Sequence, residues 1–204
     1  MTEPERLEKA EHAKHESPVR RIFVESALIV FSILLALAAN QWNDSRKQHA
    51  LAGRALTAVR EEIASNIRNI GLKRPYHGTM WIATKRADSL RLVHSLANFY
   101  AVAPAWSGFM NPEYDGTAWQ SALSLGAVGS MGFDTVRTLS RLYALQGKID
   151  AYASNIESFD FADAAMASTV RRMYVYFATV ATNEDTLVNR YTQALKLLDP
   201  PKEK

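Results

Sequence analysis

The 204-residue chain contains no cysteine, which excludes disulfide bonds, thiolate metal sites and a cysteine nucleophile. Glycine and proline are scarce, at 9 and 7 residues, too few for a fibrous or disordered chain. Three catalytic signatures are also missing: a Gly-x-Ser-x-Gly elbow, a Ser-x-x-Lys pair and a glycine loop followed by a phosphate-binding lysine. The sequence therefore indicates no catalytic residue, no metal site and no cofactor.

What the chain does have is one long hydrophobic run near its N-terminus. Residues 22–39 read IFVESALIVFSILLALAA, with Glu25 as the single charge. As a helix, a run of this length rises about 27 Å, close to the hydrocarbon thickness of a bilayer. Two arginines precede the run, and Trp42 follows it where an interfacial aromatic anchor is expected. We predict an uncleaved transmembrane helix at residues 20–42.

Three other interpretations of this run compete with the membrane span. A buried core helix of this length usually contains more polar residues. A cleaved signal peptide would share the paired arginines and Ala36-Leu37-Ala38, but the leading tail is long and holds five glutamates. The stretch Arg20-Arg21-Ile22-Phe23 also resembles part of a twin-arginine signal, although no cofactor motif follows it. An uncleaved anchor is the interpretation that the sequence favours.

Positive charge follows the hydrophobic run directly. Residues 43–91 hold ten Lys and Arg against four Asp and Glu, whereas residues 92–204 hold nine against eleven. A basic block in this place suits anionic lipid headgroups, and no aromatic-basic pattern supports nucleic acid as a partner. Basic residues are nearly balanced across the run, so the paired arginines and the short tail decide the orientation. They favour a cytoplasmic N-terminus and a periplasmic domain.

The rest of the chain has the apolar spacing of helices and no sustained strand alternation. Residues 1–19 are a charged tail, and residues 43–204 are the helical soluble domain. Apolar residues spaced three or four positions apart predict that the membrane helix continues as one rod to about Gly71. Four more helices are expected, at about 76–102, 117–128, 133–152 and 161–198. The predicted fold is all-α: one transmembrane helix continuing into a membrane-tethered bundle of about four main helices.

The helix expected at residues 76–102 has a predicted inward face of its own. Its largest apolar side chains recur with helical spacing. They are Trp81, Ile82, Leu90, Val93, Leu96 and Phe99.

Several short patterns recur along the chain: a glutamate at the start of the span, Trp-Asn and Arg-Lys after it, a Glu-Ile-x-x-Asn stretch and a Thr-x-Trp block. The residues are Glu25, Trp42, Asn43, Arg46, Lys47, Glu62, Ile63, Asn66, Thr117, Trp119, Gly126, Leu139, Ser140 and Tyr143. Together they resemble the pattern of an uncharacterised bacterial family of single-span inner-membrane proteins with a helical soluble domain. The resemblance implies a bacterial inner-membrane protein and brings no activity with it.

Six residues are candidates for contact with a partner. Glu25 within the span is costly unless it reaches the headgroups, bonds to a partner helix or relays protons. Ser32 adds a small residue that suits close helix packing. Trp42 is the expected interfacial anchor. The aromatic residues Trp106, Phe109 and Trp119 lie in or after a Pro- and Gly-rich stretch, where they line a ligand groove, form a protein-binding surface or fill the core.

The other ionisable residues are better explained by ordinary solvated or structural roles than by metal binding or catalysis. His12 and His15 stand three apart beside glutamates, but a solvated tail offers a metal no supporting shell. His77 and His94 lie too far apart on one predicted helix to converge. The acidic cluster of Glu157, Asp160 and Asp163 suits a solvated helix start better than paired-carboxylate catalysis.

The leading functional hypothesis is a non-enzymatic, membrane-anchored helical interaction protein, an accessory subunit or scaffold of a bacterial membrane complex. Its partners would be the lipid bilayer and another membrane protein or a second copy of the chain. The alternative is a sensor-like module that binds a small ligand. A hydrolase without recognisable motifs is a third class, which would require a polar pocket with perturbed ionisable groups.

Overall fold

The structure is a computed structural model that describes residues 18–111, 113–154, 159, 161–162 and 165–199. These residues form five α-helices, one short 3₁₀ helix and no strand, which confirms the all-α prediction. Contacts divide the chain into an N-terminal unit, Met1–Gln48, and a C-terminal unit, His49–Lys204. The helices are α2 (Pro18–Ser89), α3 (Leu96–Val102), α4 (Thr117–Ser124), α5 (Phe133–Ala153) and α6 (Met166–Leu198), with the 3₁₀ helix η1 at Ala127–Ser130.

The described part of the N-terminal unit is residues 18–48 of α2. We call the run of apolar residues in it, residues 22–39, the apolar section of α2. Residues 20–42 are helical throughout, as predicted for the span. An eighteen-residue window of this helix has a mean hydropathy of 2.5, and none of it is buried within the structure. By length and composition, this section is therefore able to cross a membrane.

Helix α2 does not end near Gly71, where the sequence predicts a stop, but continues through Pro75 to Ser89. Just beyond this end, Arg91 has a φ of 50°, a left-handed conformation that is common after the C-terminus of a helix. The helix predicted at residues 76–102 is therefore two elements, the last turns of α2 and the short helix α3. In its described residues the C-terminal unit consequently has three long helical sections, two short α-helices and the 3₁₀ helix η1.

The inward face of α2 explains why the helix continues. Within the C-terminal unit a seven-residue repeat of buried and half-buried residues runs along α2, at 52, 56, 59, 63, 66, 70, 73, 77, 80, 84 and 87, with buried Glu62 beside it. Helix α6 carries the same repeat, at 166, 170, 173, 177, 180, 184, 187, 191, 194 and 198. A repeat of this kind keeps one seam of a helix facing a partner helix. Tertiary packing along the seam thus outweighs the local cost of glycine and proline within α2.

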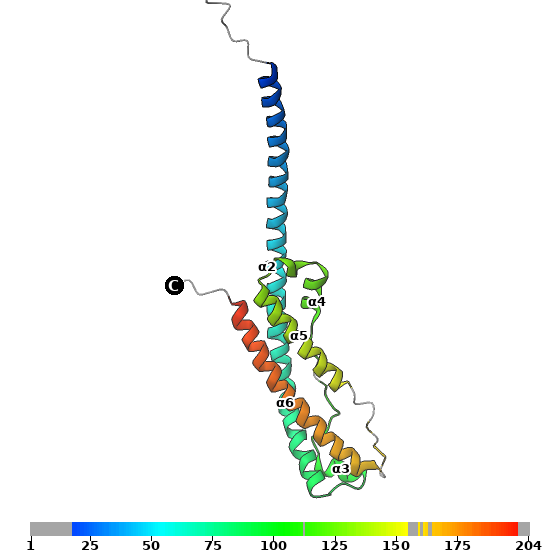
Figure 1. The fold of residues 1–204 in the computed structure, drawn as a ribbon. Helices are drawn as coiled ribbons and strands as arrows, with labels where there is room; N and C mark the ends of the chain where they lie inside the picture. Colours follow the sequence, from blue (N-terminus) through cyan, green and yellow to red (C-terminus); the bar gives the residue numbers. More distant parts are fainter. Residues whose placement is uncertain (1–17, 112, 155–158, 160, 163–164, 200–204) are drawn as a thin grey trace, which may run out of the picture. The chain divides into compact units, whose positions relative to one another are not determined.

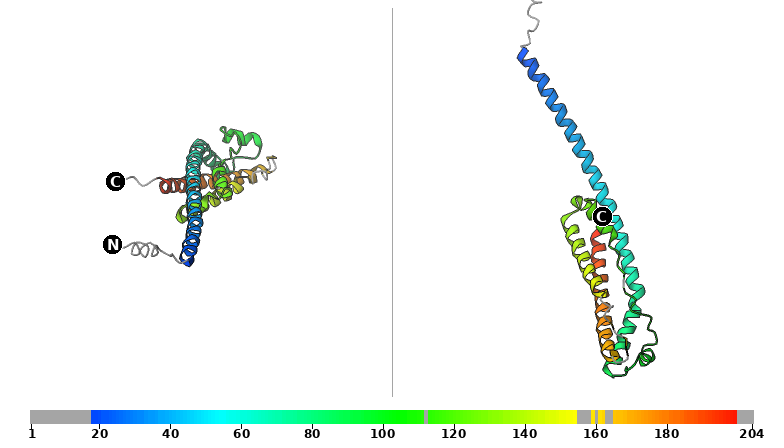
Figure 2. Two further views of the ribbon diagram at one scale, coloured as in Figure 1. Left: turned by 90° about the horizontal axis from the view of Figure 1, so that it is seen from above. Right: turned by 90° about the vertical axis from the view of Figure 1, so that its right-hand side faces the viewer.

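Helices α2 and α6 run antiparallel in the C-terminal unit, because Asn66 contacts Tyr191 whereas His77 contacts Glu184. Helix α5 lies beside both of them (Figures 1 and 2). One apolar cluster joins the start of this α2 section, α4, α5 and the end of α6, around Ile63, Trp119, Leu139, Tyr143 and Tyr191. A second cluster joins the end of α2, α3 and the start of α6, around Met80, Phe99, Met173 and Phe177.

The predicted inward face of residues 76–102 is wrong in its first half. Ile82 and Leu90 are largely exposed, and Trp81 is on the border of exposure. The side chains that point inward there are instead those of His77, Met80, Thr84 and Ala87. Val93 and Phe99 are buried as expected, and Leu96 is half-buried.

The continuity of α2 predicts the effect of a glycine substitution. Gly71 lies inside the helix, and a Cβ added there meets no atom within 4 Å. Gly71→Ala should therefore raise the free energy of unfolding by about 0.5–1 kcal/mol, because alanine favours the helix and restricts the unfolded chain. Urea unfolding of the full-length protein in detergent, followed by circular dichroism, measures the change.

The control is Gly126, whose φ of 70° is left-handed. Gly126→Ala should lower stability by about 1 kcal/mol, because a side chain strains this conformation. A loss of stability in Gly71→Ala, similar to that of the control, would show that α2 breaks at Gly71.

Candidate functional site

The seam between the helices contains polar residues at positions that are normally apolar. Glu62, Asn66, His77 and Thr84 on α2 are buried, and so is Glu184 on α6. A buried polar group is costly unless it is hydrogen-bonded, so each of these side chains needs a partner inside the unit.

Several of the partners come from the backbone of residues 104–116, which has no regular secondary structure in its described part. The carboxamide of Asn66 donates to the carbonyl of Asp115 at 2.8 Å and accepts from the amide of Asp115 at 2.9 Å. The ammonium of Lys73 donates to the carbonyl of Asn111 at 2.7 Å. The hydroxyl of Tyr76 donates to the carbonyl of Gly108. The polar side chains of α2 therefore replace the hydrogen bonds that a helix or sheet would give this segment.

Glu62 connects the same helix to α4 and α5. The hydroxyl of Tyr143 donates to Glu62 Oε1 at 2.5 Å, and the amide of Ala118 in the first turn of α4 donates to Oε2 at 2.6 Å. Burial, with the adjacent carboxylate of Glu62, raises the pKa of the Tyr143 phenol far above its ordinary value. The ring of Trp119 stacks on that of Tyr143, with centroids 5.6 Å apart. Glu62 is thus an anchor for the N-terminus of α4.

Gln146 on α5 completes the network. Its carbonyl accepts from the Tyr191 hydroxyl at 2.7 Å, and its amino group donates to the carbonyls of Tyr114 and Asp115 at 3.2 and 3.3 Å. Asn66 in turn donates to the Tyr191 hydroxyl at 3.3 Å. Three helices and the 104–116 segment therefore share one set of bonds.

His77 and Glu184 form a buried pair, with His77 Nδ1 and Glu184 Oε1 2.8 Å apart and both side chains fully inaccessible to solvent. His77 Nε2 lies 3.0 Å from the carbonyl of Met110. Both ring nitrogens thus lie within hydrogen-bonding distance of an oxygen atom. The pair is sealed from solvent and holds the segment to α2 and α6.

Two buried oxygens, Glu184 Oε2 and the Tyr114 hydroxyl, have no hydrogen-bond partner among the described residues. Burial raises the pKa of the Tyr114 phenol strongly, and the negative charge of Glu184 adds to the shift. The tyrosine therefore remains a neutral hydroxyl beside the buried carboxylate.

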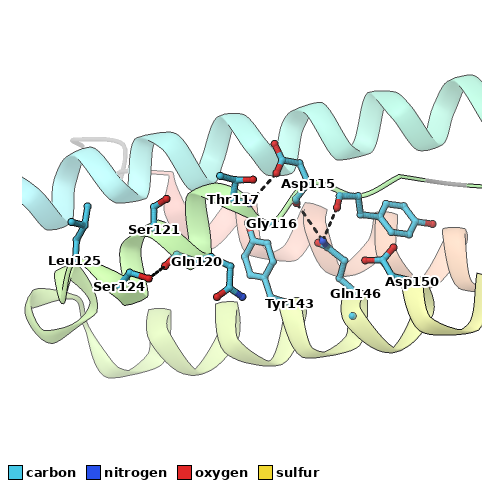
Figure 3. A pocket seen from close by; sticks show the side chains of 12 residues that line it. Asp115, Gly116, Thr117, Gln120, Ser121, Ser124, Leu125, Tyr143, Gln146 and Asp150 are labelled. Atoms are coloured by element: carbon cyan, nitrogen blue, oxygen red, sulfur yellow. Dashed lines mark hydrogen bonds between the residues drawn. The ribbon is translucent and has the colours of Figure 1, made fainter. Parts of the chain in front are cut away.

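A groove of about 780 Å³ opens beside this network, between residues 114–125 and α5 (Figure 3). Hydroxyls, two side-chain amides and two carboxylates line it, and none of the lining residues that the structure describes is Lys, Arg or His. The lining residues are Tyr114, Asp115, Gly116, Thr117, Gln120, Ser121, Ser124, Leu125, Tyr143, Gln146, Gly147 and Asp150. The groove therefore offers negative charge and hydrogen-bond acceptors to a ligand.

The two carboxylates of the groove differ in their electrostatics. Hydrogen bonds from Thr117 lower the pKa of Asp115, whose side chain accepts from the Thr117 amide at 2.9 Å. Partial burial raises the pKa of Asp150 from an ordinary 3.8 to about 6. Asp115 is thus occupied in starting α4, whereas Asp150 is the carboxylate that would gain most from a cation in the groove.

The sequence-predicted candidates are divided between the units. Glu25, Ser32 and Trp42 lie on the exposed section of α2, where the Ser32 hydroxyl donates to the carbonyl of Leu28 at 2.8 Å. The guanidinium of Arg46 lies 5.2 Å from the Trp42 ring centroid. Glu25, Ser32 and Trp42 therefore lie outside the groove.

The aromatic candidates are packed inside the C-terminal unit. Trp106 and Phe109 are half-buried, with ring centroids 5.1 Å apart, and both contact Phe177. Trp119 is buried in the first apolar cluster. Only the exposed remainder of Trp106 and Phe109 is open to a partner. His12, His15, Glu157, Asp160 and Asp163 lie outside the described residues.

The sequence patterns did not single out Glu62, Asn66, Gln146 or Asp150 as site residues. A signal existed for two residues of α2: Asn66 and His77 continue the seven-residue repeat set by Val59, Ile63 and Ile70. For Gln146 and Asp150 no such signal exists, because their significance comes from a segment more than twenty residues away in the chain.

The His77–Glu184 pair allows a double-mutant test. Glu184→Ala should lower the free energy of unfolding by about 3–5 kcal/mol, since removing one partner leaves the other buried without its bond. The double variant His77→Leu/Glu184→Met should lose at least 1 kcal/mol less unfolding free energy than the sum of the losses in His77→Leu and Glu184→Met alone. Residues in direct contact show coupling of about this size. Urea unfolding of all variants measures the coupling.

Asp134→Ala serves as the comparison, because Asp134 forms an exposed ion pair with Arg137. Its effect should stay below about 1 kcal/mol. Additive effects of the changes at His77 and Glu184 would contradict their direct interaction.

The raised pKa of Asp150 predicts that removing its charge stabilises the folded protein more at neutral than at acidic pH. Its carboxyl is protonated in both states below about pH 4, ionises in the unfolded chain first, and ionises in the folded protein near pH 6. The folded state is therefore penalised progressively between pH 4 and 6, and fully above pH 6. Asp150→Asn should stabilise the protein at pH 7.5 by up to about 1 kcal/mol more than at pH 4, allowing for solvent screening.

Urea unfolding at the two pH values tests this expectation, with Glu61→Gln, an exposed change on α2, as the control. An equal effect of Asp150→Asn at both pH values would show that Asp150 has an ordinary pKa.

Comparison with known proteins identifies no relative. No family model matches the sequence, no curated protein matches it, and no solved structure matches it. The resemblance of its sequence patterns to a single-span bacterial family therefore stays a prediction.

Proposed function

We propose that this chain is a membrane-anchored helical interaction protein, an accessory subunit or scaffold of a bacterial inner-membrane complex, with its C-terminal unit in the periplasm. The observation that carries the proposal is the apolar section of α2, with a mean hydropathy of 2.5 and none of that window buried. Each exposed Leu, Ile, Val or Phe side chain forgoes about 1.5–3 kcal/mol of burial. A bilayer supplies that cover along the whole section.

The interior of the C-terminal unit supports interaction over catalysis. The polar groups there are largely engaged with the backbone of residues 104–116, and the His77–Glu184 pair has no access to solvent. An acid–base pair must reach a substrate proton to act on it. Recruitment of a partner requires only a fixed surface, which this network stabilises.

The span offers a surface for a partner helix. Glu25, Ser32, Ala36 and Ala39 are spaced by seven, four and three residues, so they share one face of α2. A carboxylate and small side chains on one face suit a hydrogen-bonded, closely packed helix pair within a membrane. The partner is another membrane protein or a second copy of the chain.

The groove favours a second candidate function, the binding of a small cationic ligand such as an organic amine. Asp150 lines the groove, its pKa is raised, and no ion pair joins its carboxylate to another of the described residues; these features support this role. This function depends on the groove alone, so a change in the span would leave it intact.

Glu25→Leu tests the interaction role. The variant should insert into the membrane as the native protein does, because leucine suits the bilayer better than glutamate. Its yield of co-purified partner should fall about tenfold, the equivalent of one charge-assisted hydrogen bond of about 1.4 kcal/mol. Carbonate extraction measures insertion, and a mild-detergent pull-down of the full-length protein from native membranes measures the complex.

Glu61→Leu is the matched control, since Glu61 is an exposed glutamate of the same helix in the C-terminal unit. The proposal fails if Glu25→Leu keeps its full yield of partner, or if the native protein is extracted from membranes by carbonate.

A further inference from the structure

A second groove, of about 420 Å³, lies between α5 and α6. The described residues that line it are Thr138, Arg141, Leu142 and Leu145 of α5 and Arg190 and Gln193 of α6. We call it the basic groove. Its volume is within the range of about 300–1,000 Å³ that is typical of small-molecule sites.

The spacing of the lining residues explains why they share one groove. On α5 they stand at positions i, i+3, i+4 and i+7, which lie on one face of a helix. On α6, Arg190 and Gln193 are three residues apart, so they also share a face. The groove that contains Asp150 uses other positions of α5, among them Tyr143 and Gln146. Helix α5 therefore contributes to two grooves of opposite charge.

The positive charge of the basic groove is not balanced by carboxylates nearby. No Asp or Glu occurs among residues 135–149 of α5 or residues 186–198 of α6. The nearest carboxylates along the two helices, Asp134 and Asp185, are paired with other arginines. Within the part of the chain that the structure describes, no ion pair involves either arginine of the groove. A bound anion would therefore reduce the repulsion between two guanidinium groups.

The groove also has the hydrogen-bond donors that an oxyanion needs. The Thr138 hydroxyl can donate one bond and the Gln193 amide two. A guanidinium adds a planar fork of N–H groups that matches two oxygens of one anion. Arg190 Nη1 donates to Gln193 Oε1 at 3.5 Å, which is long for a hydrogen bond. A charge-assisted bond to an oxyanion is shorter and about twice as strong, so Arg190 would gain by binding one.

The deeper part of the groove is apolar. Leu142 is buried and Leu145 is half-buried, and both belong to the first apolar cluster or pack against it. The two arginines are exposed. A ligand that fits this gradient has an anionic head and a small apolar substituent.

We propose that the basic groove binds a phosphate monoester with a small apolar substituent, its phosphate between Arg141 and Arg190 and its substituent against Leu142 and Leu145. A phosphate monoester carries a charge of about −1.5 to −2 near pH 7, which matches two guanidinium groups better than the single charge of a carboxylate. Its three terminal oxygens also provide acceptors for the hydroxyl and the amide of the groove. Binding here involves α5 and α6 alone, so it is independent of membrane anchoring and of the interaction role proposed above.

Butyl phosphate is the probe, and isothermal titration calorimetry of the full-length protein in a nonionic detergent at pH 7.5 measures its binding. Arg141→Gln and Arg190→Gln should each weaken binding about tenfold, the loss expected for one charge-assisted hydrogen bond. Both arginines are exposed, so neither substitution removes a core side chain. Circular dichroism should show unchanged helix content in both variants.

Arg68→Gln is the matched control, because Arg68 is an exposed arginine of α2 that does not line the groove. It removes the same charge and should change the affinity less than about twofold, since exposed charges at a distance interact weakly.

Two further ligands test the chemistry of the site. Butanoate should bind about fivefold or more weakly than butyl phosphate, because it offers one negative charge and two oxygens. Inorganic phosphate should also bind about fivefold or more weakly, because it has no apolar group to bury against the leucines.

The phosphate monoester can be a soluble molecule or the headgroup of phosphatidic acid. The titration is therefore repeated in phosphatidylcholine nanodiscs that contain either phosphatidic acid or phosphatidylglycerol, an anionic phosphodiester. A lower affinity for butyl phosphate in the phosphatidic acid discs alone assigns the site to the lipid headgroup, which competes with the probe. Equal affinity in both kinds of disc assigns it to a soluble ester.

Equal binding of butyl phosphate to the native protein and to the double variant Arg141→Gln/Arg190→Gln overturns the inference, as does no binding to the native protein. A loss in Arg68→Gln as large as that in Arg141→Gln also overturns it, because attraction to general positive charge then explains the binding. Equal affinity for butanoate refutes the phosphate, and equal affinity for inorganic phosphate refutes the apolar contact. None of these results changes the outcome expected for Glu25→Leu, so the two proposals fail separately.

Discussion

The C-terminal unit depends on one constraint. The peptide groups of residues 104–116 need hydrogen-bond partners, but the peptide groups of the neighbouring helices are already bonded within those helices. A helix satisfies its own backbone and leaves only side chains for a neighbouring segment. Asn66 meets this need at Asp115 with both ends of its carboxamide. Lys73 and Tyr76 each donate one bond to another carbonyl of the segment, and Gln146 donates to the carbonyls of Tyr114 and Asp115. The position of the groove follows, because this segment forms one of its walls.

The same constraint explains what the sequence could and could not predict. The apolar repeat from Leu51 to Ile70 correctly indicates the buried face of α2, since the buried positions there are hydrophobic apart from Glu62 and Asn66. Beyond Ile70 the repeat continues with Lys73, His77 and Thr84, so apolar periodicity pointed to Ile82 and Leu90 on the wrong face. The groove could not be predicted, because Asp115 and Asp150 are brought together only by folding.

Helix α2 illustrates how tertiary packing overrides local preference. Pro75 in a helix interior costs about 3 kcal/mol and each glycine about 1 kcal/mol relative to alanine. A stop near Gly71 is therefore the sensible local prediction, and it is wrong because the seam continues. Met80 is buried in the second apolar cluster, and His77 is bonded to Glu184 and Met110. Ending the helix early would leave Glu184 buried and unpaired, which is more costly than a proline.

The distribution of polar groups separates structure from function in this chain. His77 and Glu184 have the residue types of a catalytic pair, but both are sealed and their bonds hold a segment in place. Asp150 is the opposite case, a carboxylate with a raised pKa that faces an open groove. A buried pair fixes the geometry around it, whereas a desolvated charge at a surface favours a partner that neutralises it. The interior of the unit thus supports its fold, and the recognition that we propose belongs to its surface and to the span.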